Sequence, residues 1–218
     1  MLLKILRGPL PRLKKIKMAD KLNELVKDFA KVKIVNKGTG AGGYKTNFNG
    51  KKFEEYTNNE SRLLENGYIK TVYNKNTFGY YLSKKTEDPS SSIVFVLQDG
   101  FKPYMKKTFD IDISFKPDEA YIITHSGKTT IKILEKKNQN CEGSVDTKLV
   151  ASYGLRCMYE YICGENFNIE YSLCLSEWFK EHQKDKYIYT NMFLDKHNIN
   201  VFYSDENYFI NLDSWINN

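Results

Sequence analysis

PDEAYIIT (residues 117–124) and KTTIKILEKK (residues 128–137) are the two stretches that decide the fold of this chain. Both are rich in residues that favour strands, and the tripeptide His125-Ser126-Gly127 between them favours a tight turn. We therefore expect adjacent antiparallel strands at Tyr121–Thr124 and Lys128–Glu135, with Asp118 at the start of the first.

An acidic pair and a lysine should meet at one end of this hairpin. Residues two apart on a strand share a face, so Glu135 and Lys137 should point the same way. The hairpin can bring Asp118 beside them, although it lies seventeen positions earlier. Two carboxylates and the main-chain carbonyl of Lys136 could bind Mg²⁺, while Lys137 orients an attacking water. Three nearby acids remain alternatives to Asp118: Asp110, Asp112 and Glu119.

The remaining pattern predicts a mixed α/β (α+β) fold, a central mixed sheet flanked by helices. The expected helices are Ala19–Val32, Lys51–Asn66 (stopped by Gly67) and Asp146–Ile162. The further expected strands are Tyr68–Tyr73, Phe78–Leu82, Ile93–Leu97, Met105–Ile111, Phe167–Leu175 and Ile199–Tyr203.

Composition places the chain among globular proteins of moderate basic charge. It has 218 residues and a net charge of +6, which is compatible with a polyanionic partner. Four cysteines without C-x-x-C spacing, and only three histidines, argue against a zinc site. No apolar run has the length of a membrane span, and we expect a cytoplasmic protein. Residues 1–17 are interpreted as a basic arm or upstream extension, with a mitochondrial presequence as the alternative, and residues 18–218 as a single domain.

A glycine-rich stretch, Gly38–Gly43, precedes the second expected helix. It lacks the Gly-Lys-Ser/Thr ending of a P-loop and a convincing strand before it, so a nucleotide-binding loop is not indicated. It is either a flexible connection or a close approach of the backbone to DNA. In the second case the contacts would come from these residues: Gly42, Gly43, Tyr44, Lys45, Thr46 and Asn47. Lys51, at the expected helix start, and Lys136 and Lys148, near the acidic pair, are further candidates for phosphate contacts.

Several of these stretches resemble one family. PDEAYI, together with IKILEKKNQNCEGSVDTKL, is similar to the core of the PD-(D/E)XK nucleases, and its later part resembles a subset of type II restriction endonucleases. The upstream GAGGYKTN…GKKFE resembles the same subset, in which a glycine-rich loop precedes a helix with a Phe-Glu pair. The resemblance covers roughly residues 38–150.

The resemblance implies a restriction-endonuclease-like core with Asp118 and Glu135 as metal ligands and Lys137 as the catalytic lysine. It implies that Glu54 contacts the metal through water, with Glu55 as the alternative, and that Gln139 can touch DNA. It further implies Mg²⁺-dependent, site-specific cleavage of double-stranded DNA by a homodimer, as in a restriction system. Three alternatives remain: a repair or junction nuclease on the same core, a non-catalytic DNA-binding protein, and a host-interaction protein with a chance motif.

Overall fold

The computed structural model describes residues 44–73, 79–139, 145–181 and 187–218. Lys45–Asn218 form one compact unit, and the description below concerns that unit. The basic arm, the expected helix Ala19–Val32 and the glycine-rich stretch with Gly42 and Gly43 lie outside the described residues.

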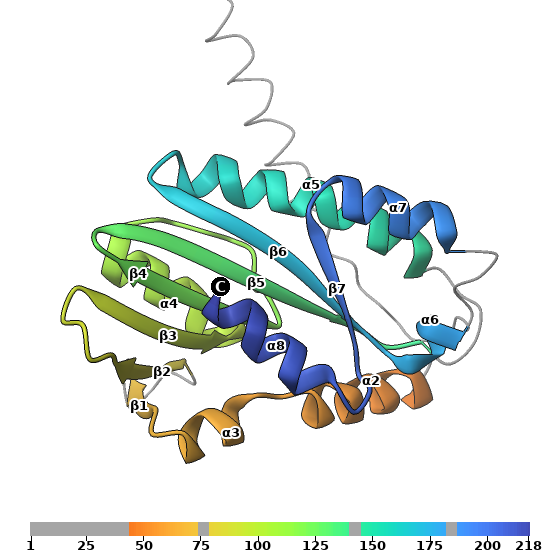
Figure 1. The fold of residues 1–218 in the computed structure, drawn as a ribbon, viewed down its shortest axis with the longest axis horizontal. Coiled ribbons are helices and arrows are strands. Elements are labelled where there is room, and N and C mark those ends of the chain that lie inside the picture. Colours follow the sequence, from red (N-terminus) through yellow and green to blue (C-terminus); the bar gives the residue numbers. More distant parts are fainter. Residues whose placement is uncertain (1–43, 74–78, 140–144, 182–186) are drawn as a thin grey trace, which may run out of the picture. The chain divides into compact units, whose positions relative to one another are not determined.

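A seven-stranded mixed sheet forms the centre of the fold, which confirms the predicted mixed α/β class (Figure 1). Its strands lie side by side in sequence order, β1 to β7. The strands β1 to β5 pair antiparallel, and β5, β6 and β7 pair parallel. Their bounds are β1 Ile69–Val72, β2 Tyr80–Lys85, β3 Ser91–Leu97, β4 Glu119–His125, β5 Lys128–Lys137, β6 Phe167–Leu175 and β7 Ile199–Tyr203.

Helices cover both faces of the sheet. Their bounds are α2 Tyr44–Tyr56, α3 Glu60–Glu65, α4 Gln98–Phe109, α5 Val145–Cys163, α6 Glu177–Glu181, α7 Ile188–Lys196 and α8 Tyr208–Asn217. One core joins α4, α5, α6 and α7 to the sheet, through residues such as Met105, Tyr159 and Ile133. The other joins α2, α3 and α8 to the opposite face, through residues such as Phe53 and Leu134. In Figure 1, α8 crosses in front of the sheet while α5 and α7 run along its parallel part.

The central hairpin forms as predicted, except that His125 belongs to β4 and the turn has two residues in place of three. β4 and β5 pair in register from Glu119↔Leu134 to His125↔Lys128. Ser126 and Gly127 close the turn with φ of 49° and 79°. Positive φ at both central residues is the conformation of the tight turns that match strand twist, and glycine adopts it without strain. The predicted strands Phe167–Leu175 and Ile199–Tyr203 are confirmed to the residue as β6 and β7.

Two predicted elements are wrong. Most of the expected strand Met105–Ile111 belongs to α4, which ends at Phe109, and Asp110 and Ile111 follow the helix. Gly100 and Pro103 disfavour a helix locally, but Phe101 and Met105, four residues apart, are both fully buried against the sheet, and this burial decides the conformation. The expected helix Lys51–Asn66 is two helices, because the chain turns at Thr57–Asn59 between α2 and α3.

Among the helices of the described ranges, none combines the length and the apolar character needed to cross a bilayer.

Candidate active site

The open end of the β4–β5 hairpin brings the predicted acidic pair and lysine together. The main-chain N–H of Lys136 donates a hydrogen bond to Asp118 Oδ2 at 2.7 Å. Lys137 Nζ lies 2.7 Å from Glu135 Oε2 and 3.9 Å from Asp118 Oδ2. The side chains of Asp118 and Glu135 are each 15% exposed and that of Lys137 is 25% exposed. The predicted convergence is therefore confirmed, and all three side chains retain access to solvent.

Glu135 carries its charge at an energetic cost. Burial raises the pKa of its carboxyl, and nearby Asp118 raises it further, while Lys137 lowers it. The net pKa stays above the ordinary glutamate value of 4.5, so the lysine does not fully compensate for lost hydration. A cation bound between the two carboxylates would remove this penalty.

Glu54 reaches the same site from α2. Burial raises the pKa of Glu54, and the next largest cause is the charge of Asp118, which shows that the two carboxylates are close enough to interact. Lys136, Lys137 and Lys51 lower it. Glu54 and the alternative, Glu55, are both exposed residues of this helix and both line the hollow.

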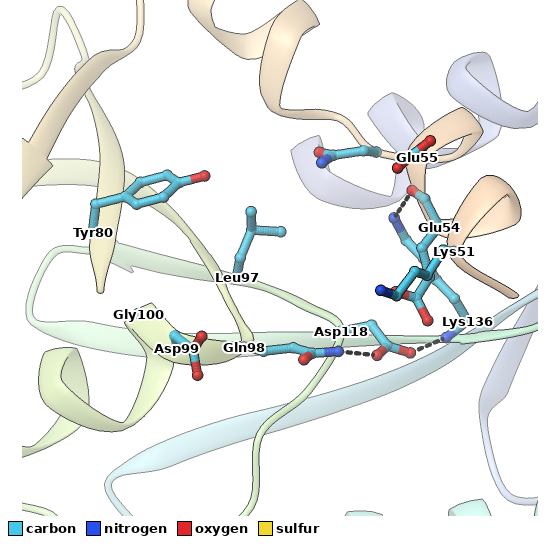
Figure 2. A pocket seen from close by; sticks show the side chains of 11 residues that line it. Lys51, Glu54, Glu55, Tyr80, Leu97, Gln98, Asp99, Gly100, Asp118 and Lys136 are labelled. Atoms are coloured by element: carbon cyan, nitrogen blue, oxygen red, sulfur yellow. Dashed lines mark hydrogen bonds between the residues drawn. The ribbon is translucent and has the colours of Figure 1, made fainter. Parts of the chain in front are cut away.

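A hollow of about 370 Å³ opens beside Asp118 (Figure 2). Its walls come from α2, from the ends of β2 and β3, and from the first turn of α4. Gln98 Nε2, in that first turn, donates a hydrogen bond to Asp118 Oδ1 at 2.7 Å. Together with the N–H of Lys136, this bond holds both oxygens of the carboxylate (Figure 2).

Sequence reasoning missed Gln98. The signal was the β3–β4 register, since Leu97 pairs with Glu119 and the next residue outward on each strand is therefore Gln98 opposite Asp118. That register could not be derived without the structure, because the connection between β3 and β4 contains a whole helix.

The burial of the Lys136 side chain argues against its predicted contact with DNA, although Lys136 is among the residues that line the hollow. This side chain points to the opposite face of the sheet from Glu135 and Lys137, as strand alternation requires. It is 3% exposed and lies 2.6 Å from Oε1 of Glu119, whose side chain is fully buried. The role of the main-chain carbonyl of Lys136 as a metal ligand stays a prediction.

The alternatives to Asp118 are placed elsewhere. Glu119 belongs to the buried pair with Lys136. Asp110 ends α4 in a left-handed conformation and pairs with Lys106, and Asp112 is 73% exposed. Asp118 is thus the acid that faces Glu135.

The remaining candidates for DNA contact divide into three groups. Lys51 and Lys148 are exposed, and Lys51 lines the hollow, so their contacts with phosphate stay predictions. Lys51 lies within α2 and not at its start, so the helix-terminus argument for it is wrong.

Gln139 is only 7% exposed and its amide has no hydrogen-bond partner in the described part of the chain, so the predicted surface contact is not available in this conformation. The third group lies in the first turn of α2, and its side chains are outside the described residues: Tyr44, Lys45, Thr46 and Asn47.

The donor set fits a hard divalent cation. Among the described residues there is no cluster of three or more His, Cys, Asp and Glu side chains arranged as a metal site. Mg²⁺, however, commonly takes one or two protein carboxylates and completes its shell with water and substrate phosphate. Asp118 and Glu135, which share the Lys137 ammonium, provide such a pair.

No model of a known protein family matches the chain, and neither the curated proteins nor the solved structures gave a match.

Proposed function

We propose that this protein is a Mg²⁺-dependent endodeoxyribonuclease that hydrolyses double-stranded DNA at specific sequences, in the manner of a type II restriction endonuclease. The observation that carries the proposal is the convergence of Asp118, Glu135 and Lys137 at one hairpin end. Of these three residues, Asp118 also lines the hollow. The expected restriction-endonuclease-like core is part of this proposal, and the mixed sheet flanked by helices is compatible with it.

Each residue has a role that its surroundings support. Asp118 and Glu135 would hold Mg²⁺, which when bound lowers the pKa of water and offsets charge on the phosphate. Lys137, 2.7 Å from Glu135, is placed to orient the attacking water and to stabilise developing negative charge. Glu54, whose pKa is raised by burial and by the charge of Asp118, would accept a hydrogen bond from a metal-bound water.

Charge and symmetry support the choice of substrate. The net charge of +6 favours a polyanion, and exposed Lys51 and Lys148 can contact phosphates. A duplex has two strands to cut, and a two-fold homodimer presents one site to each strand of a palindromic sequence. The proposal therefore includes a homodimer.

Cleavage of unmethylated phage DNA with Mg²⁺, followed by sequencing of the fragment ends, tests the proposal. We expect discrete fragments whose ends share a sequence. Glu135→Ala should abolish cleavage and retain DNA binding. Glu165→Ala is the matched control, because this exposed acid precedes the start of β6, which pairs with β5 near Thr129 and not near the site.

The other outcomes separate the alternatives. A ladder of fragments, or cutting that depends on branches, would indicate a repair or junction nuclease. Binding without any Mg²⁺-dependent cutting of mixed-sequence DNA would indicate a non-catalytic DNA-binding protein. Full cleavage by Glu135→Ala would remove the assignment of the site.

A further inference from the structure

A buried ion pair lies directly behind the candidate active site. Lys136 and Glu119 are the strand neighbours of Glu135 and Asp118, but their side chains point to the opposite face of the sheet. Nζ of Lys136 lies 2.6 Å from Oε1 of Glu119, and the two side chains are 3% and 0% exposed. Removing two charges from water costs more than their attraction commonly returns, so stability alone does not account for this pair.

The pair is the centre of a hydrogen-bond network that reaches α2. Glu119 Oε1 also accepts from the main-chain N–H of Asn59, at 3.3 Å, and Oε2 accepts from the Tyr121 hydroxyl at 2.9 Å. That hydroxyl in turn accepts from the Asn59 amide at 3.1 Å. Asn59 is fully buried in the turn between α2 and α3, so this turn is fixed to the sheet through Glu119.

Lys136 makes a second connection to the same helix. Its Nζ donates to the main-chain carbonyl of Glu54 at 3.5 Å, as the dashed line in Figure 2 shows. Glu54 lines the hollow together with Asp118, whose charge raises the pKa of the Glu54 carboxyl after the larger effect of burial. The ammonium is therefore linked both to the strand that carries Asp118, through Glu119, and to the backbone that carries Glu54.

We propose that the buried Glu119–Lys136 pair is a positioning device, which docks the α2–α3 turn onto β4 and β5 and so holds Glu54 against Asp118 across the mouth of the hollow. Lys136 is among the residues that line the hollow. Glu119 and Lys136 are nevertheless positioning residues, because both side chains are buried on the opposite face of the sheet from Glu135 and Lys137 and act through Asn59 and Glu54. This inference rests on the proposed nuclease function for its activity readout, and has a second readout that does not depend on that function.

The first test replaces both charges together. Glu119→Leu/Lys136→Met leaves no unpaired buried charge, so the fold should survive, as replacement of buried pairs by apolar residues commonly allows. A displacement of about 1 Å at a catalytic group can cost on the order of 100-fold, so we expect kcat for plasmid cleavage to fall about 100-fold, with KM for DNA changed less than about threefold. Glu119→Gln/Lys136→Met is the milder second variant, since the substituted amide oxygen still accepts from Asn59, while the links of the ammonium to Glu54 and to position 119 and the acceptor of the Tyr121 hydroxyl are lost. Here we expect a loss of roughly 10-fold.

Lys132→Met is the matched control. Lys132 is a second buried lysine on the same face of β5, and it donates to the Trp215 carbonyl at 2.6 Å and pairs with Glu170 at 3.1 Å. It lies four residues from Lys136, about 13 Å along the strand, and its hydrogen bond and ion pair are with α8 and β6. We expect it to unfold at a lower temperature and, while folded, to cleave with a kcat within about threefold of wild type, since it leaves α2 in place.

Hydrogen exchange gives the independent readout. The Asn59 amide should exchange at least about 10-fold faster in Glu119→Leu/Lys136→Met than in wild type or Lys132→Met, because its acceptor is lost. If wild type does not cut DNA, the function proposal fails, and this exchange still decides the positioning role. The inference is overturned if both variants of the pair cleave at the rate of Lys132→Met, or if exchange at Asn59 is unchanged in Glu119→Leu/Lys136→Met.

Discussion

Gly100→Ala tests how closely α4 must approach the sheet, and with it the wall of the hollow. A Cβ at position 100 would lie 2.1 Å from the main-chain oxygen of Tyr80, whereas ordinary van der Waals contact begins at 3.4 Å. The helix would have to withdraw by 3.4 − 2.1 = 1.3 Å, and the obstacle is backbone, which cannot rotate away as a side chain can. Overpacking of this kind costs about 1–3 kcal/mol, which in a domain of this size lowers the unfolding midpoint by roughly 2–12 °C.

The same displacement should reach the active site. Gln98 belongs to the same turn of α4 and holds Asp118 Oδ1 at 2.7 Å, so this hydrogen bond should be lost or lengthened. We expect plasmid nicking to fall by about 10- to 100-fold at a temperature where the variant is folded.

Gly154→Ala is the control for the substitution itself. Gly154 lies within α5, and a Cβ there would meet no heavy atom within 4 Å. Alanine should therefore stabilise the helix by about 0.8–1 kcal/mol and leave cleavage unchanged. Thermal unfolding followed by circular dichroism measures both variants. A Gly100→Ala midpoint equal to that of wild type would refute the close approach.

Three further predictions concern charge. Burial raises the pKa of Glu135 and that of Glu54 above 4.5, and metal binding requires the ionised carboxylates. The rate of cleavage should therefore fall as the pH drops through these raised pKa values. The acid limb of the pH–rate profile measures this, and an acid limb at or below pH 4.5 would contradict it. A carboxyl whose pKa is raised in the folded state stabilises the fold at low pH, and this stability is lost as the pH rises through the raised pKa. Without Mg²⁺, Glu135→Gln should therefore unfold at a higher temperature than wild type at pH 8, and the difference in unfolding midpoint should shrink towards about pH 4.5. Equal midpoints at both pH values would show that burial does not raise the pKa of Glu135. Lys148→Ala should reduce the slope of log K against log salt for DNA binding by about 0.9, measured by fluorescence anisotropy in Ca²⁺, whereas Lys128→Ala, exposed at the far end of the hairpin, should leave it unchanged.

The central hairpin was predictable because its signals are local. The period of two along residues 131–137 placed Glu135 and Lys137 on one face, and the same period implied that Lys136 faces the other way. The predicted DNA contact of Lys136 neglected that implication. The sequence placed the turn over three residues, His125–Gly127, and indicated only that a hairpin could bring Asp118 towards Glu135. The two-residue turn at Ser126-Gly127, which sets the register that places Asp118 opposite Glu135, came from the structure.

The rest depended on contacts that sequence does not reveal. The helix α4 contains both Gly100 and Pro103, and only the burial of its apolar face against the sheet overrides their local preference. Gln98 and Glu119 acquire their roles from partners 20 and 60 residues away, Asp118 and Asn59. Such partners are set by how helices dock on the sheet, and no spacing in the chain encodes this directly.

The change from antiparallel to parallel pairing at β5 has a consequence for the kinetics of folding. β4 and β5 are joined by a two-residue turn, whereas β6 and β7 join the sheet only after crossovers through α5 and through α6 and α7. Contacts that are close in sequence carry the smaller loop-closure entropy and form first. A nascent chain can therefore assemble the end of the hairpin that bears Asp118, Glu135 and Lys137 before the residues beyond Cys163 have left the ribosome, and the parallel strands then bury a sheet edge that is already in place.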